Sequence, residues 1–140
     1  MKNRLISGIL FIALGVLIAI GPKIIFPVCG TMGEEFMKCH WTAQAELGIG
    51  GLIIILGVLL LLLASKMLRL GIQIAIILQF AEAILIPSVL IGVCEGNHMR
   101  CHSLPWPVWN VLGSAGILFG MLNAIYLWKE QKRSQIPDEK

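Results

Sequence analysis

Four long stretches of the chain carry almost no charge, and they constrain the fold more than any other feature. Asp, Glu, Lys and Arg are absent from residues 5–22, 47–65, 70–94 apart from Glu82, and 101–128. A hydrocarbon core about 30 Å thick is crossed by about 20 apolar residues in a helix. The pattern therefore predicts four membrane-spanning helices. They are expected over residues 5–21, 46–64, 70–93 and 107–128.

Composition excludes the common soluble classes. Hydrophobic residues make up 57% of the 140 residues and charged residues only 14%, whereas about 25% of a soluble domain is charged. The net charge of +3 is also too small and scattered for a nucleic-acid-binding protein. We expect an all-α, four-helix transmembrane bundle that forms a single membrane domain over residues 1–140 and contacts the lipid bilayer directly.

Lysine and arginine set the expected orientation. If both termini lie in the cytoplasm, eight of these residues fall inside and three outside, namely Lys23, Lys38 and Arg100. Such an excess on the cytoplasmic side is the rule for multi-pass proteins. Lys2 and Arg4 precede the first apolar run as in a secretory signal, but no small-residue cleavage site follows, so we expect a retained helix. Residues 129–140 are then predicted to form a mobile cytoplasmic tail.

Aromatic and small residues indicate how these helices sit and pack. Trp41, Trp106 and Trp109 are predicted to mark the outer interface, and Tyr126 and Trp128 the inner one. Small residues recur one or two turns apart in every helix, which permits close backbone approach in lipid. We expect them to pack within one bundle, with a homo-oligomer as the alternative. The pairs are Gly8 and Gly15, Gly50 and Gly57, Gly71 and Ala75, and Gly116 and Gly120.

A motif of four residues occurs twice. Met37-Lys38-Cys39-His40 precedes the second predicted span, and Met99-Arg100-Cys101-His102 precedes the fourth. Each follows a Val-Cys pair at the end of the preceding helix, Val28-Cys29 and Val93-Cys94. This repetition predicts two duplicated helical hairpins, residues 1–65 and 66–128, related by an axis along the membrane normal. Such an axis brings both Cys-His elements to the same outer rim.

These features resemble an uncharacterised family of small bacterial four-helix membrane proteins, described as a domain of unknown function. The family is marked by Met-Lys-Cys-His-Trp in the first outer loop and a second Cys-His in the other, and the resemblance extends over residues 5–128. It implies a multi-pass protein of the bacterial cytoplasmic membrane that accompanies export-type ABC transporters. It supplies no catalytic residues.

All four cysteines fall in the predicted outer loops, where the compartment is oxidising. This placement favours disulfides, with Cys29 to Cys39 and Cys94 to Cys101 as the natural pairs, although four cysteines allow three pairings. The alternative is a membrane thiol-disulfide oxidoreductase. Enzymes of that kind use a Cys-x-x-Cys pair, whereas nine and six residues separate the cysteines of each loop here.

A third interpretation of the two motifs is a ligand site. Met37, Met99, His40 and His102 together offer donors that suit a copper or zinc ion. The two histidines can instead be the axial ligands of a haem, with the cysteines still in disulfides. His98 has no counterpart in the first loop.

Hydrolytic catalysis is not expected. The only aspartate, Asp138, lies in the predicted tail, while all three histidines lie outside, so a Ser-His-Asp group cannot form. Glu46 is placed near the start of the second helix. There a carboxylate stabilises the positive end of the helix dipole, and it can also orient a neighbouring histidine.

Polar residues also lie inside the third and fourth predicted spans. Glu82 must face the bundle interior, be protonated, or both, and Gln79 shares its face one turn away. The two form either a proton or ion pathway or a neutral hydrogen-bonded pair in the core. Pro87 is predicted to kink the third helix. Gln73 and Asn123 reach similar depths and are expected to hydrogen-bond.

The leading functional hypothesis is an accessory membrane module that binds a haem or a metal ion at its outer rim through His40 and His102. The alternatives are the oxidoreductase and a purely structural subunit of an ABC transporter complex with disulfide-closed loops.

Overall fold

The computed structural model describes residues 2–25, 31–32, 35–36, 38–91 and 105–135. Its helices are α1 (Lys2–Ile24), α2 (Lys38–Leu62), α3 (Lys66–Leu85) and α5 (Pro105–Gln135), with a single π-helical turn, η1 (Ile86–Leu90), directly after α3. Two short antiparallel strands precede α2, β1 (Thr31–Met32) and β2 (Glu35–Phe36), with Thr31 opposite Phe36. The described part of the chain is therefore an almost purely helical bundle.

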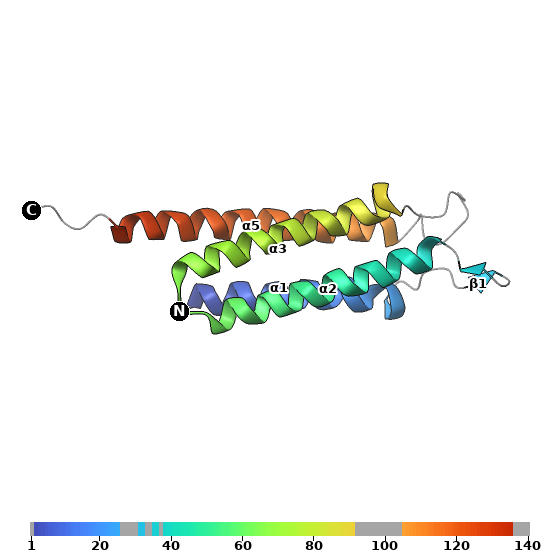
Figure 1. Cartoon of the computed structure of the whole chain (residues 1–140), viewed down its shortest axis with the longest axis horizontal. Coiled ribbons are helices and arrows are strands. Elements are labelled where there is room, and N and C mark those ends of the chain that lie inside the picture. The colour runs from blue at the N-terminus through green and yellow to red at the C-terminus, as the bar shows by residue number, and fades with distance from the viewer. Residues whose placement is uncertain (1, 26–30, 33–34, 37, 92–104, 136–140) are drawn as a thin grey trace, which may run out of the picture.

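The helices form two antiparallel hairpins that lie side by side, α1 with α2 and α3 with α5 (Figure 1). The start of α1, the α2–α3 connection and the end of α5 lie together at one end, which we call the terminal end. The starts of α2 and α5 and the β1–β2 pair lie at the opposite end, which we call the loop end. All four helices are long and apolar enough to cross a membrane. The expected four-helix architecture is confirmed.

The helices extend beyond the charge-free stretches from which they were predicted. Pro22 lies inside α1, α2 begins at Lys38 rather than at residue 46, and α5 continues to Gln135. Residues 129–135, expected in a mobile tail, are thus helical. An uncharged run marks the depth of the hydrocarbon, but a helix that satisfies its own backbone hydrogen bonds has no reason to end where charge begins.

Pro87 interrupts the third helix, as its sequence position predicts. Proline has no N–H, so the carbonyl of Ala83 cannot receive its usual helical hydrogen bond. The chain responds with the π-helical turn, in which the N–H of Ile91 donates to the carbonyl of Ile86 at 3.0 Å. Pro87 itself is fully buried.

Three phenylalanines join the two hairpins near the middle of the core. Phe11 of α1 lies 6.1 Å from Phe80 of α3 and 5.3 Å from Phe119 of α5, measured between ring centroids. The Phe11–Phe119 pair is edge-to-face, and in soluble proteins such a pair adds about 0.5–1.5 kcal/mol beyond its buried area. Aliphatic residues of all four helices complete the core around them, including Ile18, Ile53 and Ile76.

Glycines bring the helices of each hairpin into close contact. A Cβ atom built on Gly50 would lie 2.6 Å from the carbonyl oxygen of Gly15, and one on Gly116 would overlap the ring of Phe80 at 2.5 Å. Gly8, Gly57 and Gly120 are equally close to the facing helix, so the predicted packing within the bundle is confirmed at these positions. For Gly71 the prediction is wrong, because Gly71 is exposed and a Cβ there would meet nothing within 4 Å.

The aromatic residues only partly follow the expected interfacial belts. Trp41, Tyr126 and Trp128 are exposed, as interfacial residues should be. Trp109, predicted to lie at the outer interface, is instead 1% exposed and belongs to the core. Trp109 lies in the second turn of α5, on the side of the helix that faces the bundle interior. Its position along the sequence gives its depth but not the direction of its side chain.

Replacement of Gly50 tests the close contact between α1 and α2. Gly50→Ala should destabilise the bundle by about 1–3 kcal/mol, because the new methyl group overlaps a backbone oxygen that cannot move alone. Gly48→Ala is the matched control, since a Cβ at Gly48 meets nothing within 4 Å. Reversible unfolding in mixed micelles measures both. Equal stability of the two variants would contradict the packing described above.

Candidate functional site at the loop end

The structure describes only part of the two Cys-His motifs. His40 lies in the first turn of α2, is half-buried, and places its ring edge-on to Trp41 with 6.0 Å between centroids. Cys39 precedes it in the same turn. The other loop residues that the sequence singles out lie outside the described residues, so neither the disulfides nor a His40–His102 pair is tested. They are Cys29, Met37, Cys94, His98, Met99, Cys101 and His102.

Glu46 is the most unusual residue at this end of the bundle. Its side chain is 0% exposed, and neither carboxyl oxygen has a hydrogen-bond partner. Buried polar side chains are nearly always hydrogen-bonded, so each exception needs an explanation. The predicted dipole role is wrong, because α2 begins eight residues earlier and Glu46 lies in its third turn.

Glu46 belongs to a layer of buried residues that we call the outer layer: Pro22, Thr42, Glu46, Pro87 and Trp109. Each of them is less than 2% exposed, and together they come from α1, α2, η1 and α5. None is an aliphatic hydrophobic residue, in contrast to most of the core around Ile53. All four chain segments therefore contribute to one unusual level of the bundle.

The helix register places these residues at a common depth. Gly50 contacts Ala19, so Glu46 and Pro22, each about one turn nearer the loop end, face each other across the first hairpin. Gly113 contacts Ile84, which aligns Trp109 with Pro87 in the same way.

The phenylalanine contact aligns the two hairpins with each other. Phe11 meets Phe119, and from this contact Pro22 and Trp109 lie about 16 and 15 Å toward the loop end, at 1.5 Å per residue. The outer layer is therefore one level of the core rather than two unrelated sites.

Two prolines each remove one helical hydrogen bond near this layer. Pro22 and Pro87 cannot donate to the carbonyls of Ile18 and Ala83, four residues before each of them. Ile18 and Ala83 are both 0% exposed, so these carbonyls lie on buried helix faces. The hydroxyl of Thr42 lies one turn from Glu46. Oxygen atoms coordinate cations where membrane helices are broken. In this layer, the two carboxyl oxygens of Glu46 are buried and have no hydrogen-bond partner.

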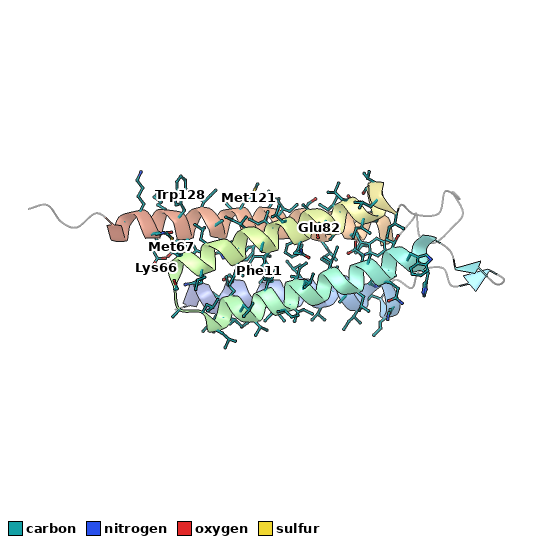
Figure 2. The ribbon with its side chains drawn as sticks, in the orientation of Figure 1. Phe11, Lys66, Met67, Glu82, Met121 and Trp128 are labelled. Atoms are coloured by element: carbon teal, nitrogen blue, oxygen red, sulfur yellow. The ribbon has the colours of Figure 1, made fainter. Side chains whose placement is uncertain are left out.

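Glu82 does not belong to the outer layer. Glu82 is exposed on α3 (Figure 2), so the expectation that it faces the bundle interior is wrong, and it does not form the expected hydrogen-bonded pair in the core. Gln79, one turn away, is half-buried, and its Oε1 has no hydrogen-bond partner. The two residues therefore do not continue a polar path into the core.

The polar pair nearer the terminal end is satisfied. The side-chain amide of Asn123 donates to Oε1 of Gln73 at 3.0 Å, and that of Gln73 donates to the carbonyl of Gly120 at 3.2 Å. Both side chains are buried. The expected hydrogen bond is confirmed, and its role is to join α3 to α5.

A ready-made metal cluster is not evident within the described ranges. No group of three His, Cys, Asp or Glu side chains lies close enough there to hold a metal ion. The sequence predicted a role for Glu46 at the start of a helix but did not predict that its carboxyl is buried in the third turn of α2. The signal that could have identified its burial is the stripe Thr42, Glu46, Gly50 and Ile53, at spacings of three and four.

Comparison with known proteins identifies the family. No curated protein and no solved structure matches the chain. The family model described as Domain of unknown function (DUF4418) matches residues 11–127, which include the whole of α2 and α3 and most of α1 and α5. The match extends over most of the chain, so the protein belongs to the DUF4418 family.

Proposed function

We propose that the protein is an accessory membrane module that binds a metal ion or a haem at its loop end, through His40 and His102. The methionines of the same motifs, Met37 and Met99, are proposed as further donors. The observation that carries the proposal is the buried carboxyl of Glu46, which has no hydrogen-bond partner. Glu46 lies six residues after His40 in α2, about 9 Å along the helix, so it would act on the bound ion through its charge and not as a ligand beside His40.

Burial of this carboxyl has an energetic cost that a cation would remove. An ionised carboxylate without a partner costs several kcal/mol in a low-dielectric interior, and a neutral one still loses about 1–3 kcal/mol of hydrogen bonding. A nearby cation compensates the ionised form directly. Because haem brings two propionate charges of its own, Glu46 favours a metal ion such as copper or zinc over haem.

Matching helix contacts support the proposed duplication of the hairpins. Gly50 meets Ala19 in the first hairpin, and Gly113 meets Ile84 in the second. The equivalent positions differ by 65 residues in the first helix of each hairpin and by 63 in the second. Gly57 with Ile12 and Gly120 with Ile77 repeat the same offsets. Cys29 and Cys94 are also 65 residues apart, and His40 and His102 are 62 apart.

Chain connectivity brings the second motif to the loop end. His102 precedes the first residue of α5 by three positions, which limits their separation to about 11 Å. The starts of α2 and α5 lie at this same end (Figure 1). If lysine and arginine orient the chain as expected, the loop end faces the oxidising side. We propose that disulfides then hold the cysteines and leave imidazole and thioether groups for the ligand.

A second candidate is a structural role beside an ABC transporter, and Glu82 favours it. An exposed carboxyl inside the span Lys66–Leu90 is costly against lipid. Contact with a helix of a partner protein would relieve that cost. In this proposal α3 provides the surface that the permease covers.

The histidine pair gives the first test. His40→Ala and His102→Ala should each lower the affinity for the bound metal or haem by at least about tenfold, since each removes a ligand. His98→Ala is the matched control from outside the repeated motif and should bind normally. Elemental analysis and absorbance spectra of the purified variants measure occupancy. Unchanged occupancy in the double variant would refute the proposal. If thiol trapping showed that the cysteines alternate between thiol and disulfide, the oxidoreductase would be favoured instead.

Replacement of Glu46 should change the stability of the protein in opposite directions without and with bound metal. In protein stripped of metal, Glu46→Met should raise stability by about 1–3 kcal/mol, because a buried carboxyl without partners is replaced by an apolar group. With metal bound, the same variant should lose part of the metal-dependent gain in stability. Gln44→Met, on the exposed face of α2, should change neither. Destabilisation of the stripped protein by Glu46→Met would show that the carboxyl has a structural partner.

Co-purification tests the second candidate. Glu82→Leu should reduce recovery of a permease or ATPase with the tagged protein, whereas Gln44→Leu should not. If wild-type protein is isolated from native membranes as a lone, stable chain, the transporter-subunit role is contradicted.

A further inference from the structure

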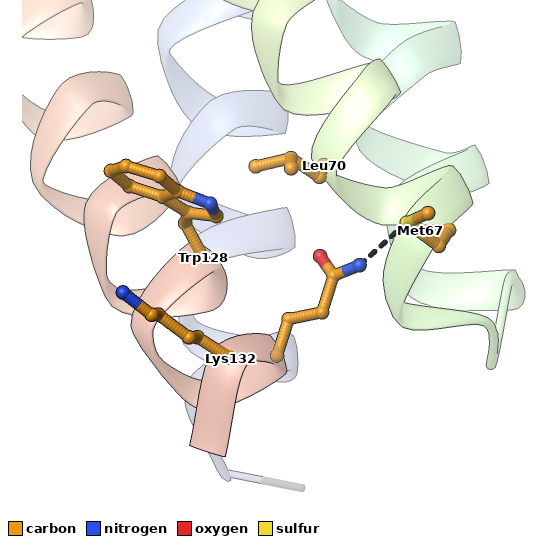
Figure 3. A pocket seen from close by; sticks show the side chains of 5 residues that line it. Met67, Leu70, Trp128 and Lys132 are labelled. Atoms are coloured by element: carbon orange, nitrogen blue, oxygen red, sulfur yellow. Dashed lines mark hydrogen bonds between the residues drawn. The ribbon is translucent and has the colours of Figure 1, made fainter. Parts of the chain in front are cut away.

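A hollow of about 280 Å³ opens between the start of α3 and the last turns of α5, at the terminal end (Figure 3). It lies at the opposite end of the bundle from the proposed metal site and is independent of it. Five side chains line it: Met67 and Leu70 from α3, and Trp128, Gln131 and Lys132 from α5. The hollow is therefore built across the second hairpin.

The lining combines an apolar wall with a cationic edge. Leu70, Met67 and the indole of Trp128 supply apolar surface, and the amide of Gln131 donates to the sulfur of Met67 across the hollow (Figure 3). Lys132 lies on the same stretch of α5 as Trp128, one turn later. Within the part of the chain that the structure describes, its amine makes no ion pair.

The position of the hollow matches the headgroup level of a membrane. Tyr126 and Trp128 are the last aromatic residues of α5 and are exposed, and charged residues begin at Lys129. Amphipathic rings concentrate at this boundary, and lysine side chains extend from it toward water. The last turns of α5 continue past the other helices (Figure 1), which leaves one side of this stretch open to lipid.

Charge around the hollow favours an anion. The last turns of α5 carry Lys129, Lys132 and Arg133 against one acid, Glu130. Glu130 is already within 3.4 Å of Lys66 in α3. A neighbouring hollow of about 300 Å³ is lined by Tyr126, Lys129, Glu130 and Arg133, so it includes that acid. The hollow at Lys132 has a base and no acid.

We propose that this hollow binds an anionic phospholipid. Its phosphate interacts with the Lys132 amine and the Gln131 amide, and its glycerol and upper acyl chain contact Leu70 and Trp128. Basic pockets between membrane helices at the headgroup level bind such lipids, and an apolar wall of this kind would be exposed to water if the occupant were a free phosphate.

The test compares two lipids and two lysines in the intact protein. Detergent-solubilised protein is titrated with dioleoylphosphatidylglycerol or dioleoylphosphatidylcholine, and bound lipid is counted by native mass spectrometry. Phosphatidylglycerol should bind more tightly, and Lys132→Gln should weaken it about fivefold, the ratio that corresponds to about 1 kcal/mol per lysine near a lipid surface. Lys129→Gln is the matched control, because it removes the same charge one turn earlier and lines the other hollow.

A fluorescence measurement on the wild-type protein tests lipid binding even if a lysine variant folds poorly. Brominated phosphatidylglycerol should quench wild-type tryptophan emission more than brominated phosphatidylcholine does, and Trp128→Phe should remove that difference. Equal loss of binding in Lys129→Gln and Lys132→Gln would overturn the proposal in favour of diffuse attraction. No preference for phosphatidylglycerol, or equal stabilisation by inorganic phosphate alone, would overturn it as well.

Discussion

Close contact between helix backbones at glycine is the interaction on which the rest of this bundle depends. In lipid there is no hydrophobic force between helices, so association relies on tight packing and on the few hydrogen bonds available. Gly50 brings α2 against Gly15 and Ala19 of α1, and Gly113 and Gly116 do the same for α5 against α3. Glu46 lies one turn from Gly50, so the contact that holds the hairpin also encloses the carboxyl.

The buried polar residues at the two ends of the core differ in their hydrogen bonding. Toward the terminal end, Gln73, Asn123 and the carbonyl of Gly120 satisfy one another, as a structural network should. Toward the loop end, Glu46 is just as buried but has no partner, and the two prolines remove further donors from the same level. This difference within one small core is the physical basis for a ligand at the loop end. The proposal adds what the buried residues of the outer layer lack, a positive charge.

Much of the architecture follows from the sequence, because charge is excluded from hydrocarbon. The uncharged stretches predicted all four helices, and equal depths predicted the bond between Gln73 and Asn123. Those arguments measure distance along a helix. They do not give the direction of a side chain around the helix, and for this reason the burial of Trp109 and the exposure of Gly71 and Glu82 were not foreseen. Glu46 was misjudged because His40, Thr42 and Gln44 are polar yet helical, so the true start of α2 lies eight residues earlier.

The most direct measurement is the absorbance spectrum and elemental composition of wild-type protein, purified from native membranes without chelators. The account predicts about one equivalent of a transition metal, or of haem, per chain. Protein that is folded, stable and free of both, and that does not take up copper, zinc or haem on titration, would contradict it.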